Sequence, residues 1–306
     1  MVDNNFPGGV WPVMLTPFTK ENNVDYNALG ELIEWYIRNG VSGLFAVCQS
    51  SEMFFLSLEE RVEIARFVKE KAAGRVPVIA SGHISDSLED QVTELNAVAK
   101  TGVDAVILIT NRMAKQDESD EIWYSNLEKL LDQIPADVKL GFYECPYPYK
   151  RVLTKELTEK SAQSGRFYFL KDTSCDIRNI EMKLSVCRDT NLKVYNANTA
   201  TLLESLKLGA AGYSGVMANS QCRLYDRLTR DFAAEDMSDL SDFLTACALI
   251  EYQCYPVNAK YYLGKYENIS METTCRTKSD TLLTETFKKE VDVLYRLTKK
   301  AEKKYL

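Results

Sequence analysis

Short apolar runs alternate with segments of helical period along most of the chain. The apolar runs are rich in β-branched and aromatic residues, which predicts buried strands. Between them lie stretches such as Leu88, Val92, Leu95 and Ala99, whose steps of 4, 3 and 4 residues predict a helix with one apolar face. The predicted strands are residues 9–16, 42–48, 77–82, 105–110, 139–145, 167–171, 192–198 and 211–217. The pattern therefore predicts a strand–helix unit that occurs eight times.

Eight such units favour an α/β fold of the (β/α)8 TIM-barrel type. The alternative, an open doubly wound sheet, places a G-x-G-x-x-G turn after its first strand, where this chain has GVWPVMLTPF. Beyond residue 237 the pattern is helical only. We therefore expect a barrel over residues 1–237 and a C-terminal helical region over residues 238–306 that packs on it.

Composition and charge narrow the class of protein. With 45% hydrophobic and 26% charged residues, the 306-residue chain can bury a large core. Its net charge of −7 argues against nucleic acid as a partner. It contains no run of 18 apolar residues, and its start, MVDNNFPGGV, lacks the basic and apolar regions of a signal peptide. We expect a cytoplasmic protein without a membrane partner.

The cysteines and the single histidine restrict the chemistry further. The closest two of the eight cysteines are seven residues apart, so no zinc-type Cys-x-x-Cys pair occurs. One histidine, His83, does not supply a histidine-based metal site, and a lone histidine is more often a structural hydrogen-bonding group. Cys145 has no adjacent base and is not expected to be a nucleophile. We expect neither a metal nor a cofactor.

In a barrel of this type the chemistry is found where the strands end. Those positions form a polar ring with one lysine: Thr16, Pro17, Gln49, Ser50, Ser51, His83, residues 110–113, Tyr143, Glu144, Lys171, Asn198 and Ser214. The ring lacks a carboxylate cluster for magnesium and a glycine-rich phosphate loop. Strand alternation turns Glu144 away from the barrel interior, toward the helices. The residues that remain favour a reaction carried out by the lysine amine with the help of neighbouring hydroxyl groups.

Lys171 follows the apolar segment FYFL at residues 167–170. Burial at the end of such a strand disfavours the ammonium form, and a neutral lysine amine attacks a keto group to give a Schiff base. Taken alone, a lysine that extends to solvent or pairs with Asp172 is the more common arrangement. The surrounding residues have to decide between these interpretations.

Two neighbouring features fit a keto-acid site. Tyr143, at the end of the preceding strand, can carry protons if the Lys171 ammonium lowers the pKa of its phenol. The turn formed by Gln49, Ser50 and Ser51 offers hydroxyl and main-chain N–H groups that can hold a carboxylate. Each feature also has a plain structural explanation, a half-buried aromatic side chain for Tyr143 and a helix N-cap for the serines. Together they indicate a Schiff-base site for a keto acid.

Several motifs carry a family resemblance over nearly the whole chain. They are G-V-W-P-V-M-L-T-P-F at 9–18, C-Q-S-S-E at 48–52, L-S-L-E-E-R at 56–61, Y-E-C-P at 143–146, F-L-K-D at 169–172 and Y-P-V-N-A-K at 255–260. With these motifs the sequence resembles the dihydrodipicolinate synthase and N-acetylneuraminate lyase family of class I aldolases. The resemblance implies that Lys171 forms the Schiff base, that Tyr143 relays protons, and that Gln49 and Ser50 bind the pyruvate carboxylate. It also implies a homo-oligomer, a tetramer built from dimers.

The sequence departs from that family where the second substrate is bound. In dihydrodipicolinate synthases an arginine follows the tyrosine by five residues, and here that position is Pro148. The family's tyrosine that reaches across the dimer is missing, because T-N-R-M stands at 110–113. The acidic residues of the N-acetylneuraminate lyases are replaced by A-N-T-A at 197–200. These departures leave the second substrate open.

We therefore expect a lyase in which Lys171 condenses with pyruvate or a related 2-keto acid. Tyr143 then transfers a proton as a carbon–carbon bond to an aldehyde forms or breaks. The expected substrate-binding residues are Gln49, Ser50, Ser51, Ser214 and Arg112, the last to bind a carboxylate of the second substrate. One alternative is a dehydratase of a 2-keto-3-deoxy sugar acid that uses the same imine. Another is a keto-acid-binding relative that has lost turnover.

Overall fold

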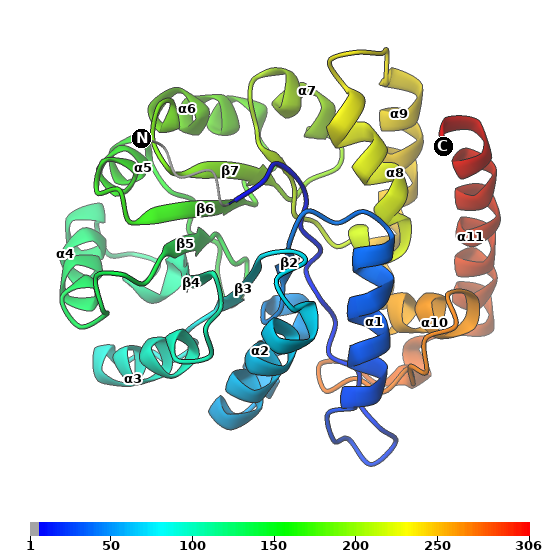
Figure 1. The fold of residues 1–306 in the computed structure, drawn as a ribbon, viewed down its shortest axis with the longest axis horizontal. Coiled ribbons are helices and arrows are strands. Elements are labelled where there is room, and N and C mark those ends of the chain that lie inside the picture. Colours follow the sequence, from blue (N-terminus) through cyan, green and yellow to red (C-terminus); the bar gives the residue numbers. More distant parts are fainter. Residues whose placement is uncertain (1–5) are drawn as a thin grey trace.

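The structure, a computed structural model, describes residues 6–306 and consists of parallel strands alternating with helices (Figure 1). Each of the eight predicted apolar runs overlaps a strand. The strands are β1 Gly9–Val10, β2 Leu44–Phe45, β3 Val78–Ser81, β4 Ala105–Ile109, β5 Leu140–Tyr143, β6 Phe167–Asp172, β7 Lys193–Asn196 and β8 Gly212–Tyr213. Most of the strands are shorter than the apolar runs that predict them. The apolar pattern continues past the last strand residue, where the main chain has already left the sheet.

The strands form one sheet in the order β1-β8-β7-β6-β5-β4-β3-β2, and all neighbouring pairs are parallel. The two outer members are joined by a single parallel bridge between Val13 and Phe45. Around this bridge Phe45 N donates to Pro12 O at 3.1 Å and Met14 N donates to Phe45 O at 3.0 Å. Pro12 has no N–H to donate, which limits the regular ladder on this side. The predicted (β/α)8 barrel is confirmed.

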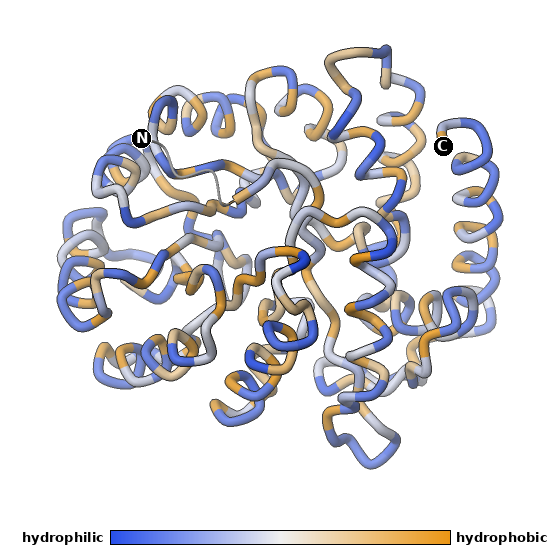
Figure 2. The backbone as a smooth tube through the Cα atoms, viewed as in Figure 1, coloured by the Kyte–Doolittle hydropathy of each residue, from blue (hydrophilic) through white to orange (hydrophobic). Residues whose placement is uncertain are grey.

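The connecting helices follow the strands in the expected order and surround the sheet. They are α1 Tyr26–Arg38, α2 Leu58–Ala72, α3 Leu88–Ala99, α4 Asp120–Leu131, α5 Lys155–Gln163, α6 Ile177–Cys187, α7 Leu202–Lys207 and α8 Ala218–Asp231. The stretch Leu88–Ala99, predicted from its apolar spacing, is a helix with Ser87 as its N-cap. Along these helices hydrophobic and hydrophilic residues alternate at short intervals, as Figure 2 shows. That alternation is typical of helices packed by one face on a sheet.

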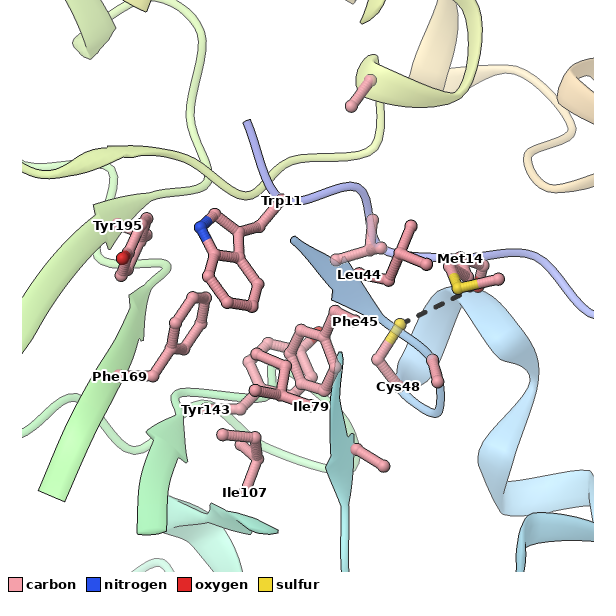
Figure 3. Close-up of a cluster of buried hydrophobic side chains, with 14 of the residues drawn as sticks. Trp11, Met14, Leu44, Phe45, Cys48, Ile79, Ile107, Tyr143, Phe169 and Tyr195 are labelled. Carbon is pink, nitrogen blue, oxygen red and sulfur yellow. Dashed lines mark hydrogen bonds between the residues drawn. The ribbon is translucent and has the colours of Figure 1, made fainter. Parts of the chain in front are cut away.

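Aromatic side chains fill the interior of the barrel. Phe169 of β6 stacks on Tyr195 of β7 with ring centroids 4.2 Å apart, and Trp11 lies 5.1 Å from Phe169 (Figure 3). Phe45 meets both Phe169 and Tyr143 edge to face. Because side chains two residues apart on a strand point to the same face, this layer lies directly beneath the next inward-facing position of β6. That position is Lys171.

The chain after α8 is helical and packs against the last part of the barrel. It contains α9 Ser238–Ala248, α10 Val257–Tyr266 and α11 Glu285–Tyr305, together with the short 3-10 helix η4 Leu249–Tyr252. Figure 1 shows these helices gathered beside α8, and Gln221 of α8 donates to the Thr298 hydroxyl of α11 at 3.0 Å. One hydrophobic core runs from the barrel into α10 and α11. A domain boundary at residue 237 stays a prediction. Between residues 6 and 306 no helix combines the length and the hydrophobicity needed to cross a bilayer.

Candidate active site

Lys171 lies inside the end of the barrel, between Tyr143 of β5 and Tyr195 of β7 in the sheet register. The residue is 4% exposed, so it does not extend to solvent. Nor does it pair with Asp172, whose carboxylate accepts hydrogen bonds from Lys183 and Ser174 instead. Burial lowers the pKa of the Lys171 ammonium, because the charged form loses its hydration. The structural interpretations of this lysine are therefore wrong, and the ammonium form of its amine is less favoured than at an exposed lysine.

Tyr143 faces Lys171 with its ring rather than with its hydroxyl. The Lys171 Nζ lies 4.3 Å from the centroid of the Tyr143 ring. The Tyr143 hydroxyl donates to Gln49 Oε1 at 3.4 Å. Burial, followed by the neighbouring Cys145 and Cys48 thiols, raises the pKa of Tyr143 well above its ordinary value. Our expectation that the ammonium lowers this pKa was wrong, because desolvation of the phenolate outweighs the attraction of the cation. In the free protein Tyr143 is a protonated phenol, a hydrogen-bond donor.

A cavity of about 510 Å³ opens above these two residues. It is lined by Gln49, Ser50, Tyr143, Pro146, Lys171, Thr173, Ala197, Gly215, Val216, Glu251, Tyr252, Tyr255, Pro256, Thr277 and Lys278. Four of the residues predicted from the sequence, Lys171, Tyr143, Gln49 and Ser50, thus surround one space. The volume exceeds what a three-carbon acid fills and leaves room for a second molecule.

The turn after β2 is a short 3-10 helix, η1 Gln49–Ser51, and its two serines have different environments. Ser50 lines the cavity. Ser51 is fully buried behind it and lies outside the lining of that cavity. The Ser51 hydroxyl lies 2.7 Å from the Met14 carbonyl oxygen and 2.9 Å from that of Ala46, and it accepts from Cys48 N at 3.1 Å. Its hydroxyl therefore holds the β1 and β2 segments together, and the structure does not bring it to the substrate space.

Arg112 and Ser214 also lie outside the residues that line the cavity. Arg112 pairs with Asp86, and its guanidinium lies 5.4 Å from the centroid of the Phe54 ring. Asp86, the carboxylate partner, belongs to the loop after β3, and the sequence did not indicate this pairing. Ser214 is fully buried directly after β8, and within residues 6–306 its hydroxyl has no hydrogen-bond partner. Neither side chain is placed to contact a molecule above Lys171.

Comparison with known proteins identifies the family. The model of the dihydrodipicolinate synthetase family matches residues 6–277. The chain belongs to this family. It is accordingly an enzyme, a carbon–carbon lyase of the class I aldolase type. Similar proteins include 4-hydroxy-tetrahydrodipicolinate synthases from Oceanobacillus iheyensis, 30% identical over 234 residues (74% of this chain, 77% of that protein), and from Psychrobacter arcticus, 27% identical over 263 residues (84% and 85%).

Solved structures support the fold of this family member. A dihydrodipicolinate synthase from Bacillus anthracis superposes with a TM-score of 0.84 at 20% identity, covering 97% of this chain and 99% of the other. YagE, a prophage protein of the same family from E. coli K12, was solved in complex with pyruvate. It superposes with a TM-score of 0.83 at 20% identity, covering 95% and 98% of the two chains. At sequence identities this low, the superpositions show only that the fold is shared, that is, the barrel and its C-terminal helices.

A buried ion cluster supports the strand ends that carry Tyr143 and Lys171. Glu144 and Asp172, each next in sequence to one of these residues, both accept a hydrogen bond from Lys183 of α6. The side chains of all three charged residues are fully buried. Glu144 thus points toward the helices, as strand alternation predicts. Burial raises the pKa of Glu144, and the Lys183 ammonium opposes that shift. The cluster joins β5 and β6 at the level of the site.

Sequence reasoning missed the C-terminal part of the lining. Glu251, Tyr252, Tyr255, Thr277 and Lys278 all come from the chain beyond α8. A signal was present in the motif Y-P-V-N-A-K, whose Lys260 donates to the buried Glu52 carboxylate at 2.8 Å. Glu52 directly follows η1 and also accepts from Thr277 N at 2.8 Å. These bonds fasten the C-terminal segment beside the turn that carries Ser50.

His83 has the structural hydrogen-bonding role expected of it, and Cys145 is buried. The His83 Nε2 accepts a hydrogen bond from Ile109 N at 2.7 Å, and its Nδ1 lies 2.9 Å from Gln91 Oε1. Burial lowers the pKa of His83 to about 4. Burial also raises the pKa of the Cys145 thiol to about 11, which disfavours the nucleophilic thiolate. Residues 6–306 contain no group of three or more His, Cys, Asp or Glu side chains suited to a metal ion.

Proposed function

We propose that this lyase forms a Schiff base between Lys171 and pyruvate or a related 2-keto acid. It then condenses that acid with an aldehyde, or cleaves the corresponding aldol product. The observation that carries the proposal is the buried Lys171 amine at the floor of a 510 Å³ cavity, with Tyr143 against it. Burial lowers the pKa of Lys171, so a larger share of the amine is neutral than at an exposed lysine. The pyruvate complex of YagE supports the choice of acid.

The steps follow from the residues around the cavity. The Lys171 amine attacks the keto carbon and water leaves, which gives an iminium ion that draws electrons from the neighbouring carbon. That carbon loses a proton to become an enamine, which attacks the aldehyde carbon, and the aldehyde oxygen gains a proton. Water then hydrolyses the iminium ion that remains, which releases the product and returns the Lys171 amine. Cleavage runs the same steps backward. Tyr143, a protonated donor beside Lys171, is the group proposed to move these protons. The imine is the electron sink, so the reaction as written calls on no further cofactor.

The Ser50 hydroxyl and the Gln49 amide are proposed to hold the carboxylate of the keto acid. Both line the cavity on the side of η1, while Lys171 approaches from β6. A carboxylate held there places its adjacent keto carbon toward the amine. Charge-assisted hydrogen bonds of this kind are short and stronger than neutral ones, which fixes the orientation of a small acid.

Borohydride trapping tests the proposal before any aldehyde is known. Reduction of an imine gives a stable secondary amine, so pyruvate with borohydride should add one pyruvate-derived mass to the peptide that contains Lys171. Lys171→Ala should abolish the addition, whereas Lys150→Ala should not, because Lys150 lies outside the lining of the cavity and donates to the Thr173 carbonyl. A wild-type protein that acquires no mass, although it is folded, would refute the Schiff-base proposal.

The family resemblance also leads us to propose that the chain forms a homo-oligomer in the cytoplasm. Light scattering on the purified protein, measured across a dilution series, tests the assembly. A single species at the mass of one chain at all concentrations would contradict it.

A further inference from the structure

Glu251 belongs to the lining of the cavity that contains the reacting amine of Lys171. It belongs to η4, the 3-10 helix between α9 and α10, and it is half-buried. Burial raises the pKa of Glu251 and lowers that of Lys171, and the attraction between the two charges opposes both shifts. Within residues 6–306 no donor forms a hydrogen bond or ion pair with this carboxylate, apart from that longer-range attraction to Lys171. A cavity-facing acceptor without a bonded donor is available to a ligand.

The remaining polar groups around Glu251 are mostly neutral. The hydroxyl groups of Thr173 and Thr277 are engaged, the first with the Glu144 carbonyl and the second with the Glu52 carboxylate, and Tyr252 has 79% of its surface exposed. In the described part of the chain the cations among the lining residues are Lys171, which the imine occupies, and Lys278, which is exposed at the opening. A molecule bound beyond the keto acid therefore meets the Glu251 carboxylate and, at the opening, the Lys278 ammonium.

Apart from Lys278 at the opening, the positions from which a carboxylate-binding cation would come are otherwise engaged. Pro148 offers no charge, and Lys150, two residues later, donates to the Thr173 carbonyl at 2.7 Å. Arg112 pairs with Asp86 away from the cavity. An acidic aldehyde seated beside Glu251 would bring two like charges together in a partly desolvated space, which is unfavourable. A hydroxyl group at the same place donates to Glu251 and satisfies it.

We propose that Glu251 is a specificity-determining residue that accepts a hydrogen bond from a hydroxyl group of the second substrate, an uncharged hydroxylated aldehyde, and disfavours aldehydes that carry a carboxylate. The inference rests on the proposed function, because it concerns the molecule that reacts with the Lys171 imine. It assigns the choice of aldehyde to the C-terminal segment rather than to a strand end of the barrel.

The test compares Glu251→Gln with the wild type on three aldehydes and pyruvate. Glyceraldehyde is uncharged and hydroxylated, propanal lacks the hydroxyl group, and succinic semialdehyde carries a carboxylate. In the variant, kcat/KM for glyceraldehyde should fall about 10- to 100-fold, the worth of a charge-assisted hydrogen bond. The value for propanal should hardly change, and that for succinic semialdehyde should rise. Glu128→Gln, on the exposed face of α4, is the matched control and should leave all three values as they are.

Borohydride trapping with pyruvate alone separates this inference from the proposed function. If wild type and variant are both trapped but the ratio of glyceraldehyde to succinic semialdehyde rates is unchanged, the inference is refuted and the Schiff-base function stands. If neither is trapped, the proposed function itself fails. Equal losses for all three aldehydes would assign Glu251 to catalysis and also overturn the inference. Glu251→Ala, which removes the same charge, repeats the comparison should the glutamine variant not fold.

Discussion

Lys183 of α6 donates a hydrogen bond to Asp172, the residue that follows Lys171 on β6. The same ammonium donates to Glu144, which follows Tyr143 on β5. One buried cation therefore compensates two buried carboxylates, and it lies directly behind the two residues proposed to carry the reaction. Removal of one partner from a buried ion pair is costly, because the remaining charges are left without compensation.

Lys183→Met should lower the free energy of unfolding by about 3–5 kcal/mol, since Glu144 and Asp172 would then share a dry space without a cation. Urea unfolding followed by circular dichroism measures the change. Lys304→Met is the matched control, because Lys304 pairs with Asp239 on the exposed surface. That variant should unfold at nearly the urea concentration of the wild type. Equal effects of the two substitutions would contradict a compensating role for Lys183.

His83 makes the stability of the fold depend on pH. Its Nε2 accepts from Ile109 N at 2.7 Å, so this nitrogen carries no proton and Nδ1 donates to Gln91. A proton on Nε2 would break the bond to Ile109. Consistent with this, burial lowers the pKa of His83 from its ordinary value of 6.5 to about 4. The unfolded chain therefore binds a proton more readily than the folded protein between these two pH values.

Because the unfolded state gains protons first, stability should fall as the pH drops from about 6.5 toward 4. The contribution of His83 amounts to about 2 kcal/mol at pH 5 relative to pH 7, as linkage gives for a shift of this size. Urea unfolding at the two pH values measures it. His83→Gln, although less stable at pH 7, should lose this part of the pH dependence. An identical difference between pH 7 and pH 5 in both proteins would exclude the histidine as its source.

The fold and the heart of the site could be predicted from the sequence because both depend on local patterns. Apolar runs located each strand, and the order of the strands brought Tyr143 beside Lys171 in register. The roles of single side chains in turns were less accessible. Ser51 and Ser50 are neighbours, yet the turn directs the Ser51 hydroxyl toward the carbonyl groups of Met14 and Ala46. Nothing in the amino-acid types at these two positions shows which serine faces the cavity.

Contacts between distant parts of the chain account for the other differences. Arg112 is paired with Asp86, 26 residues away, and Glu251 reaches the cavity only because the C-terminal helices fold back beside α8. Hydrophobic periodicity identifies such helices but does not state where they pack. The direction of the Tyr143 pKa shift likewise depends on how completely the ring is buried, which requires the assembled barrel.

Tyr143→Phe should separate proton transfer from imine formation. If the phenol moves protons, turnover should fall roughly 10²- to 10⁴-fold, the usual worth of general acid–base catalysis. Borohydride should still trap pyruvate on Lys171, because the amine and its surroundings remain. Tyr147→Phe is the control, since Tyr147 is 50% exposed and packs on Phe54. Unchanged turnover in Tyr143→Phe, with the fold intact by circular dichroism, would remove Tyr143 from the mechanism.

The two serines of the η1 turn provide a matched pair that tests how the site is divided between binding and structure. Ser50→Ala removes a hydroxyl group from the cavity lining, so the KM for pyruvate should rise about 10- to 100-fold, as expected for a lost charge-assisted hydrogen bond. Its unfolding should hardly change. Ser51→Ala leaves the Cys48 amide without its side-chain acceptor, and the free energy of unfolding should fall by about 1–3 kcal/mol.

Steady-state kinetics and urea unfolding on both variants measure the two quantities separately. The opposite result, a stability loss in Ser50→Ala and a selective rise of KM in Ser51→Ala, would show that Ser51 contacts the substrate. Ser50 and Ser51 are adjacent serines in the same turn after β2. The expected difference between the two variants therefore follows from the direction in which each hydroxyl points. The comparison therefore tests the geometry of the turn itself rather than the presence of serine.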